Sequence, residues 1–243
     1  MKSRIKKSFI AEFALFSIIL AVVVGGLGYA GYSLVTSRAP AAEASAPRSK
    51  SVIVDAGHGG EDGGATGVSG VLEKELNLAV AEKTAALFRL LDFDVTMTRE
   101  SDISLGEDAP KGKRKMTDLK KRLDAANARP DAVFLSIHMN KFPQEVCRGF
   151  QLWYSPNSDT SRRLADIIEA TVKTNLQQDN TRQSKKAGES IYILHRIKNT
   201  AVLAECGFIS NKEECAKLSD SSYQNTLAAC LVYSVNDFYN NVG

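Results

Sequence analysis

Two histidines and two glutamates of this sequence stand where they could serve metal-dependent chemistry: His58, Glu73, His138 and Glu205. His58 follows an apolar, β-branched run and precedes a cluster of glycines, a pattern typical of a side chain presented at the C-terminal end of a strand. Open α/β sheets place their binding sites at that edge. Glu73 opens a stretch of helical apolar periodicity soon after the glycines, so this part of the chain offers half of a metal site.

The other half of the predicted site lies much later in the chain. His138 ends a second apolar run and is expected at the same sheet edge as His58, although strand capping is an equally simple role for it. Two imidazoles and one carboxylate would give Zn²⁺ three protein ligands and leave a position for water. Glu205 stands in an apolar run just before a glycine, where an unpaired charge is costly. We interpret Glu205 as a general base for metal-assisted hydrolysis.

The elements that must position these residues alternate between strand-like and helix-like patterns, which predicts one layered α/β domain. The expected strands are residues 51–55, 93–98, 132–138, 149–154, 191–194 and 201–206. The expected helices are residues 76–91, 116–128, 161–177 and 223–239. The first and third strands are nearly continuous apolar runs, as in strands covered on both faces. We therefore predict a mostly parallel central sheet of about six strands flanked by helices.

The N-terminal segment has the pattern of a membrane helix. Residues 13–35 contain no charged residue and follow a basic flank that consists of Lys2, Arg4, Lys6 and Lys7. Such a run can cross the roughly 30 Å bilayer core, and the basic flank places the rest of the chain outside the cytoplasm. A cleaved signal peptide is the alternative. We expect an anchor or signal segment at 1–35, a flexible Pro-punctuated linker at 36–50 and the folded domain at 51–243.

Composition bounds the partners of this domain. The chain has 243 residues, of which 44% are hydrophobic and 24% charged, enough for one full-sized core. The net charge of +3 includes the basic flank, so the remainder is nearly neutral, which argues against nucleic acid as a partner. The cysteines, at 147, 206, 215 and 230, form no C-x-x-C motif and are expected to be free thiols, with one disulfide left open.

The motifs around the four candidate residues resemble those of zinc-dependent N-acetylmuramoyl-L-alanine amidases. They are, in chain order, His58-Gly59-Gly60, Glu73-Lys74 with Asn77, Ser136-Ile137-His138-Met139-Asn140 and Glu205-Cys206-Gly207-Phe208-Ile209-Ser210-Asn211. The order and spacing agree over residues 51–239. Within the family, the motifs that begin at His138 and Glu205, beside an N-terminal membrane segment, are similar to those of the spore-cortex amidases called CwlD.

This resemblance implies a function for each candidate residue. His58, Glu73 and His138 would bind zinc and Glu205 would be catalytic, whereas Glu75 is a weaker alternative to Glu73. The implied reaction is hydrolysis of the amide bond between the lactyl group of N-acetylmuramic acid and L-alanine in peptidoglycan, with roles in spore-cortex modification and germination. The implied substrate-binding residues are Asn140, Arg182 and Lys185. Other zinc hydrolases of peptidoglycan, such as carboxypeptidases or deacetylases, and a non-catalytic wall-binding protein remain as alternatives.

The loop after His138 bears on access to the metal. Some relatives are blocked by a helix inserted there, which adds a carboxylate to the zinc until a partner displaces it. Here residues 139–148 are few and include Pro143, so we predict no blocking helix and a metal open to solvent. Glu145 is the one carboxylate of this loop that could reach the metal. Control would then come from the substrate, the membrane anchor or an accessory protein of unknown identity.

Overall fold

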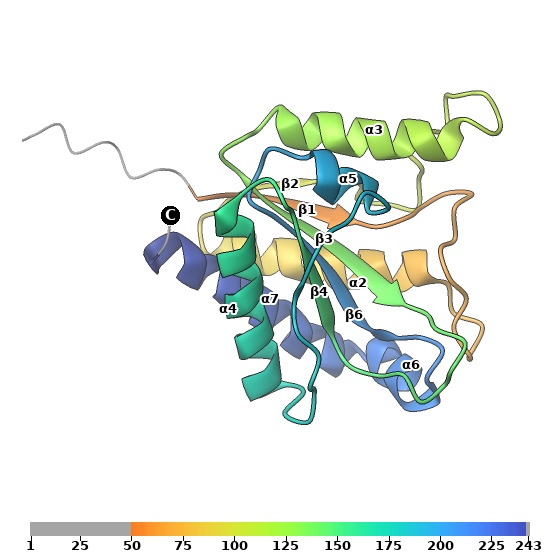
Figure 1. The fold of residues 1–243 in the computed structure, drawn as a ribbon. Coiled ribbons are helices and arrows are strands. Elements are labelled where there is room, and N and C mark those ends of the chain that lie inside the picture. The colour runs from red at the N-terminus through yellow and green to blue at the C-terminus, as the bar shows by residue number, and fades with distance from the viewer. Residues whose placement is uncertain (1–49, 242–243) are drawn as a thin grey trace, which may run out of the picture. The chain divides into compact units, whose positions relative to one another are not determined.

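A computed structural model describes residues 50–241, which form a six-stranded sheet with helices on both faces (Figure 1). The strand order is β2-β1-β3-β6-β4-β5. All neighbouring strands run parallel except β4 and β6, which are antiparallel. The predicted α/β class and mostly parallel sheet are therefore confirmed. The strands are β1 (Ser51–Ala56), β2 (Asp94–Met97), β3 (Val133–Asn140), β4 (Gln151–Tyr154), β5 (Lys185–Lys186) and β6 (Ala201–Phe208).

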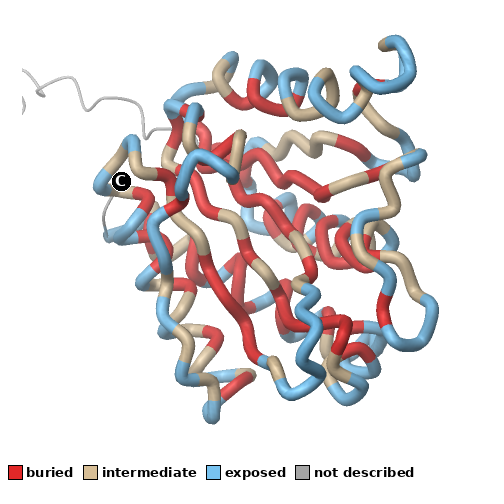
Figure 2. Tube along the Cα trace, turned by 45° about the vertical axis from the view of Figure 1, so that its right-hand side comes forward, coloured by how far each residue is buried: buried red, intermediate tan, exposed pale blue. Residues whose placement is uncertain are grey.

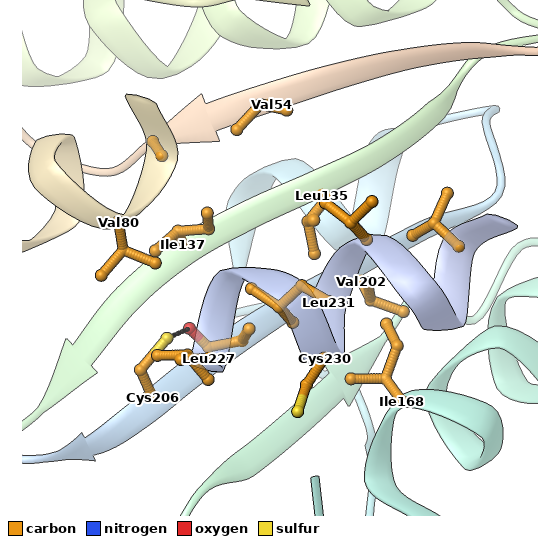
Figure 3. Packing of buried hydrophobic residues seen from close by; sticks show 14 of the residues in the cluster. Val54, Val80, Leu135, Ile137, Ile168, Val202, Cys206, Leu227, Cys230 and Leu231 are labelled. Atoms are coloured by element: carbon orange, nitrogen blue, oxygen red, sulfur yellow. Dashed lines mark hydrogen bonds between the residues drawn. The ribbon is translucent and has the colours of Figure 1, made fainter. Parts of the chain in front are cut away.

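One face of the sheet carries the larger helical layer. Helices α2 (Glu73–Leu90), α4 (Asp159–Asn175) and α7 (Ser221–Asn241) cover it, and α6 (Lys212–Ser219) precedes α7. Val54, Leu135 and Val202 lie in register on neighbouring strands and project into this layer. There they join one buried cluster with residues such as Val80 of α2 and Leu231 of α7 (Figure 3). This cluster is the main hydrophobic core and fixes the central strands.

The opposite face carries a smaller layer made of α3 (Arg114–Asn127) and α5 (Tyr192–Arg196). Ile53, Phe134 and Ala201 are in register and form a second buried cluster with Leu123 of α3 and Leu194 of α5. The central strands are therefore buried over most of their length (Figure 2). Because side chains alternate along a strand, every second residue of β1, β3 and β6 projects toward this smaller layer.

The prediction of a strand at 191–194 is wrong. Residues 192–194 are instead the first residues of α5, and the short strand Lys185–Lys186 occupies the edge of the sheet. Periodicity cannot distinguish helix from strand in so short an apolar run, and here the helix buries Ile193 and Leu194 under the sheet face. Helix α6 was not predicted. Its first turn is capped by the side chain of Asn211, which accepts from the Glu214 amide at 3.0 Å.

The predicted anchor at 1–35 and the linker up to residue 49 lie outside the described residues. Between residues 50 and 241, no helix combines the length and the apolar character needed to cross a membrane. The prediction of free thiols is confirmed: all four cysteines are unpaired, and only Cys147 is not fully buried.

Candidate active site

Strand register places His138 and Glu205 side by side. The two residues are opposite one another in the parallel β3–β6 pair, so their side chains project from the same face of the sheet. The register shifts immediately after His138, which ends regular pairing at the edge where the site lies. Oε2 of Glu205 is enclosed and has no hydrogen-bond partner within residues 50–241. A buried carboxylate oxygen without a partner is costly, which indicates that it faces a proton, an ion or a substrate group when the protein works.

His58 follows β1 in an unusual backbone conformation that two buried arginines hold in place. Its φ of 61° is uncommon for a residue other than glycine. Arg122 donates to the carbonyls of Ala56 and His58, both at 2.8 Å. Arg99 donates to the carbonyl of Ala56 at 2.9 Å and to that of Gly57 at 3.0 Å. Three successive carbonyl groups thus accept from two guanidinium groups, and the direction of the His58 side chain is fixed by the backbone beneath it.

Arg122 is held in turn by two carboxylates. It contacts Asp55 and Asp118 at 2.6 Å each. Asp55 also accepts from Ser136 at 2.6 Å and from Thr98 at 2.7 Å. Burial raises the pKa of Asp55, but the Arg122 charge and these hydrogen bonds outweigh burial and hold that pKa below its ordinary value. This network ties β1, β3 and α3 together directly below the histidine loop.

Replacing Arg122 with methionine is expected to lower the free energy of unfolding by about 3–5 kcal/mol, because Asp55 would remain buried without its cation. The carbonyls of Ala56 and His58 would also lose a donor. Urea unfolding of the purified protein measures the effect. Arg89→Met is the matched control, since Arg89 pairs with Glu100 at the surface and should contribute less than about 1 kcal/mol. Equal losses in the two variants would contradict the role given to Arg122.

Glu73 begins α2 and is only 5% exposed. Its Oε2 accepts from the Ala65 amide at 2.9 Å. Its Oε1 faces two ring nitrogens, Nε2 of His58 at 3.2 Å and Nδ1 of His138 at 3.0 Å. Two glycines make this approach possible. A Cβ at Gly57 would lie 2.1 Å from Cε1 of His138, and one at Gly64, where φ is +67°, would lie 2.6 Å from Oε2 of Glu73.

The structure thus brings the three predicted metal ligands together: one donor atom from each of His58, Glu73 and His138 lies within 4.8 Å of the others. Glu75, the alternative to Glu73, instead accepts from the amide of Leu72 at the start of its own helix. The side chain of Glu145 is exposed and is not part of this group either. Residues 139–150 are all described and contain no helix, so the prediction that no helix blocks the site from this loop is confirmed.

The charges of the cluster favour a cation. Burial raises the pKa of Glu73, but hydrogen bonds from His138 and His58 outweigh burial and hold it well below the ordinary value, so Glu73 is an anion. Burial lowers the pKa of His58, yet bonds to Asp62 and Glu73 raise it to about 9. Without a metal, His58 is therefore protonated at neutral pH, and its positive charge lies beside the carboxylate of Glu73. Two imidazoles and one carboxylate are a ligand set that suits a divalent metal such as zinc, and the residues fit such an ion.

Glu205 has the opposite electrostatic character. Burial raises its pKa to about 7, with the charge of Glu73 adding to the shift and that of His138 opposing it. A carboxyl group that titrates near neutral pH can both accept and donate a proton, which is what general acid–base catalysis requires.

The candidate substrate-binding residues lie at different distances from this cluster. Asn140 is opposite Phe208 at the end of the β3–β6 pair, close to His138 in sequence and at the same edge. Arg182 stacks over Phe208 at 4.6 Å and lines a cavity of about 640 Å³ that contains none of the three clustered residues. Lys185 lies on the edge strand, 5.6 Å from the ring of Trp153. The structure does not bring Arg182 and Lys185 into the cluster, so their roles stay predictions.

Three residues that contact His58 or its loop have no role assigned from the sequence: Asp62, Arg99 and Arg122. Asp62 contacts Nδ1 of His58 at 3.0 Å, and the two arginines hold the His58 loop. A cavity of about 350 Å³ opens beside His58 and is lined by Asp62 together with the basic residues Lys111, Arg114 and Lys115. Asp62 lies four residues after His58 in the glycine-rich segment, and Thr98-Arg99 and Leu119 with Arg122 are further positions at which the sequence resembles the amidase family.

Comparisons with known proteins agree with this geometry. A family model described as N-acetylmuramoyl-L-alanine amidase matches residues 52–237, a range that contains all four candidate residues. The germination-specific N-acetylmuramoyl-L-alanine amidase of Bacillus subtilis (strain 168) is 32% identical over 196 residues, which cover 80% of this chain and 81% of that protein. The structure of the CwlD amidase from Clostridioides difficile, in complex with the GerS lipoprotein, is similar with a TM-score of 0.75 and 33% identity over 80% of this chain and 100% of that one. An N-acetylmuramoyl-L-alanine amidase from Clostridium difficile 630 gives a TM-score of 0.71 and 27% identity, with 80% and 99% covered.

Proposed function

The chain belongs to the N-acetylmuramoyl-L-alanine amidase family, and from this premise we propose that it is a zinc-dependent cell-wall amidase whose metal is held by His58, Glu73 and His138. The reaction of the family is hydrolysis of the amide bond between the lactyl group of N-acetylmuramic acid and L-alanine of the peptide stem. The observation that carries the proposal is the approach of two ring nitrogens to Oε1 of Glu73, at 3.2 and 3.0 Å.

A zinc ion bound there would act as a Lewis acid, polarising the scissile carbonyl and making water a stronger nucleophile. Glu205 moves the protons. Its ionised carboxylate accepts a proton from the attacking water as the new carbon–oxygen bond forms. It then donates that proton to the nitrogen of L-alanine as the carbon–nitrogen bond breaks. A pKa near 7 suits both transfers, and Oε2 of Glu205 has no hydrogen-bond partner among residues 50–241.

We further propose where this chemistry takes place. A cell-wall substrate requires the domain to act outside the cytoplasm, and residues 1–35 would serve as the anchor or signal segment that brings it there, with 36–50 as the linker. The similarity to a germination-specific amidase and to CwlD supports a role in modifying the spore cortex for germination. The complex of the C. difficile amidase with the GerS lipoprotein supports a search for an accessory protein partner of this chain.

Mass spectrometry of muropeptides tests the proposed reaction. Incubation of peptidoglycan with the zinc-loaded protein should release stem peptides that begin with L-alanine and leave glycan strands with free lactyl groups. Release of terminal D-alanine would indicate a carboxypeptidase, and loss of acetyl groups a deacetylase. Binding of the wall without any product would indicate a non-catalytic protein. Each of these three outcomes would refute the proposed function.

A further inference from the structure

Both ring nitrogens of His58 face a carboxylate. Nε2 lies 3.2 Å from Oε1 of Glu73 and points into the candidate metal cluster. Nδ1 lies 3.0 Å from Oδ2 of Asp62, which stands in the same loop. Within residues 50–241 the group that could hold a metal comprises His58, Glu73 and His138, so Asp62 contacts a candidate ligand without belonging to the group.

Asp62 is held in place by contacts that do not involve the His58 side chain. Its amide and carbonyl exchange hydrogen bonds with Gly59, at 3.2 and 2.9 Å. Its Oδ1 accepts from the Gly64 amide at 3.1 Å, which leaves Oδ2 directed at the imidazole. Nζ of Lys115 also lies near this carboxylate, at 3.7 Å from Oδ2. The turn therefore presents one carboxylate oxygen to Nδ1 as a fixed acceptor.

We propose that Asp62 is a positioning residue that fixes the tautomer and ring orientation of His58 for the metal. An acceptor at Nδ1 keeps the ring proton on that nitrogen and leaves the lone pair of Nε2 free to bind. The negative charge also makes the imidazole a stronger donor to a cation. This inference rests on the proposed function, because it assumes that the cluster binds zinc. His138 differs, since its Nδ1 faces Glu73 itself.

The test is the zinc affinity of Asp62→Asn, measured by competition with a chromophoric chelator. The dissociation constant should rise by about 10- to 100-fold, the usual effect of losing such a partner. Glu61→Gln is the matched control and should bind zinc like the wild type. Glu61 is the neighbouring carboxylate, but it pairs with Arg114 at 2.7 Å and does not contact the histidine. Equal affinity in Asp62→Asn and wild type would overturn the inference and leave the proposed function standing.

The first part of a second measurement needs only the wild-type protein. Nitrogen-15 NMR of the zinc-loaded wild-type protein should show the N–H proton of the His58 imidazole on Nδ1. An N–H proton on Nε2 would overturn the inference. In Asp62→Asn the Nδ1 resonance should shift, whereas a purely structural role in the turn would leave it unchanged. A wild-type protein that binds no zinc would refute the metal site and this inference together.

Discussion

Replacing Glu205 with glutamine is expected to lower kcat/KM by a factor of about 10² to 10⁴ and to leave the bound metal in place. Glutamine keeps the size of the side chain but cannot accept the proton from water. Glu205 is not part of the group whose donor atoms converge within 4.8 Å, so its loss should not release zinc. Steady-state kinetics and metal analysis of the same preparation measure the two effects separately.

The control for this variant is Glu145→Gln, which alters an exposed carboxylate in the loop after His138. It should retain both activity and zinc. A strong rise in the activity of Glu145→Gln would instead mean that the Glu145 carboxylate reaches the metal and inhibits the enzyme. Loss of zinc from Glu205→Gln would show that the roles assigned to Glu73 and Glu205 are wrong.

The pH profile follows from the same residue. Glu205 acts as a base only when it is ionised, so activity should fall as pH drops through its pKa. Burial raises that pKa to about 7 in the metal-free protein. A nearby metal cation favours the ionised form and lowers the pKa, so the acidic limb of kcat/KM should lie below about pH 7. A profile that rises toward acid would contradict a base in this position.

Much of the site could be predicted from the sequence, because the C-terminal ends of neighbouring parallel strands lie at the same edge of a sheet. The apolar runs before His58 and His138 predicted two central strands, and these strands are neighbours with parallel direction. Glu205 then lies opposite His138 through the register of β3 and β6. Three of the four candidate residues, His58, His138 and Glu205, were therefore predictable from one pattern: apolar strands, separated by helices, each followed or ended by a polar residue.

The surroundings of the site could not be predicted in the same way, because they depend on contacts between distant residues. Arg122 donates to the carbonyl of His58 across 64 residues, and Arg99 reaches Gly57 across 42. The positive φ of His58 has no local signal either, since glycine is the residue expected in that conformation. Long-range hydrogen bonds fix this loop, and a pattern read along the chain does not contain them.

Removing the metal with a chelator is expected to abolish activity and to preserve the fold. His58, Glu73 and His138 come from three separate elements, and each is anchored by contacts that need no metal. Arg122 holds the backbone at His58, the Ala65 amide holds Glu73, and the sheet holds His138. Metal analysis should find one zinc per chain before treatment, and far-UV circular dichroism should change little after it. Full activity in the absence of zinc would refute the metal site.

The stabilisation that zinc provides should increase with pH. In the metal-free protein, burial lowers the pKa of His58, but bonds to Asp62 and Glu73 raise it to about 9. Its ordinary value is about 6.5, so the stability that this proton contributes is present below that pH and is lost as pH rises through about 9. Zinc must displace the same proton, so it binds more tightly as pH rises over this range.

Thermal unfolding with and without zinc at about pH 6 and about pH 8 measures this linkage. Zinc at about 100 times its dissociation constant should add about 2.7 kcal/mol, and at a fixed zinc concentration the increment should be larger at the higher pH. Glu73→Gln removes the anionic ligand and should unfold at the same temperature with or without zinc. An increment that shrinks with pH would mean that His58 does not exchange its proton for the metal, and a Glu73→Gln protein still stabilised by zinc would place the metal elsewhere.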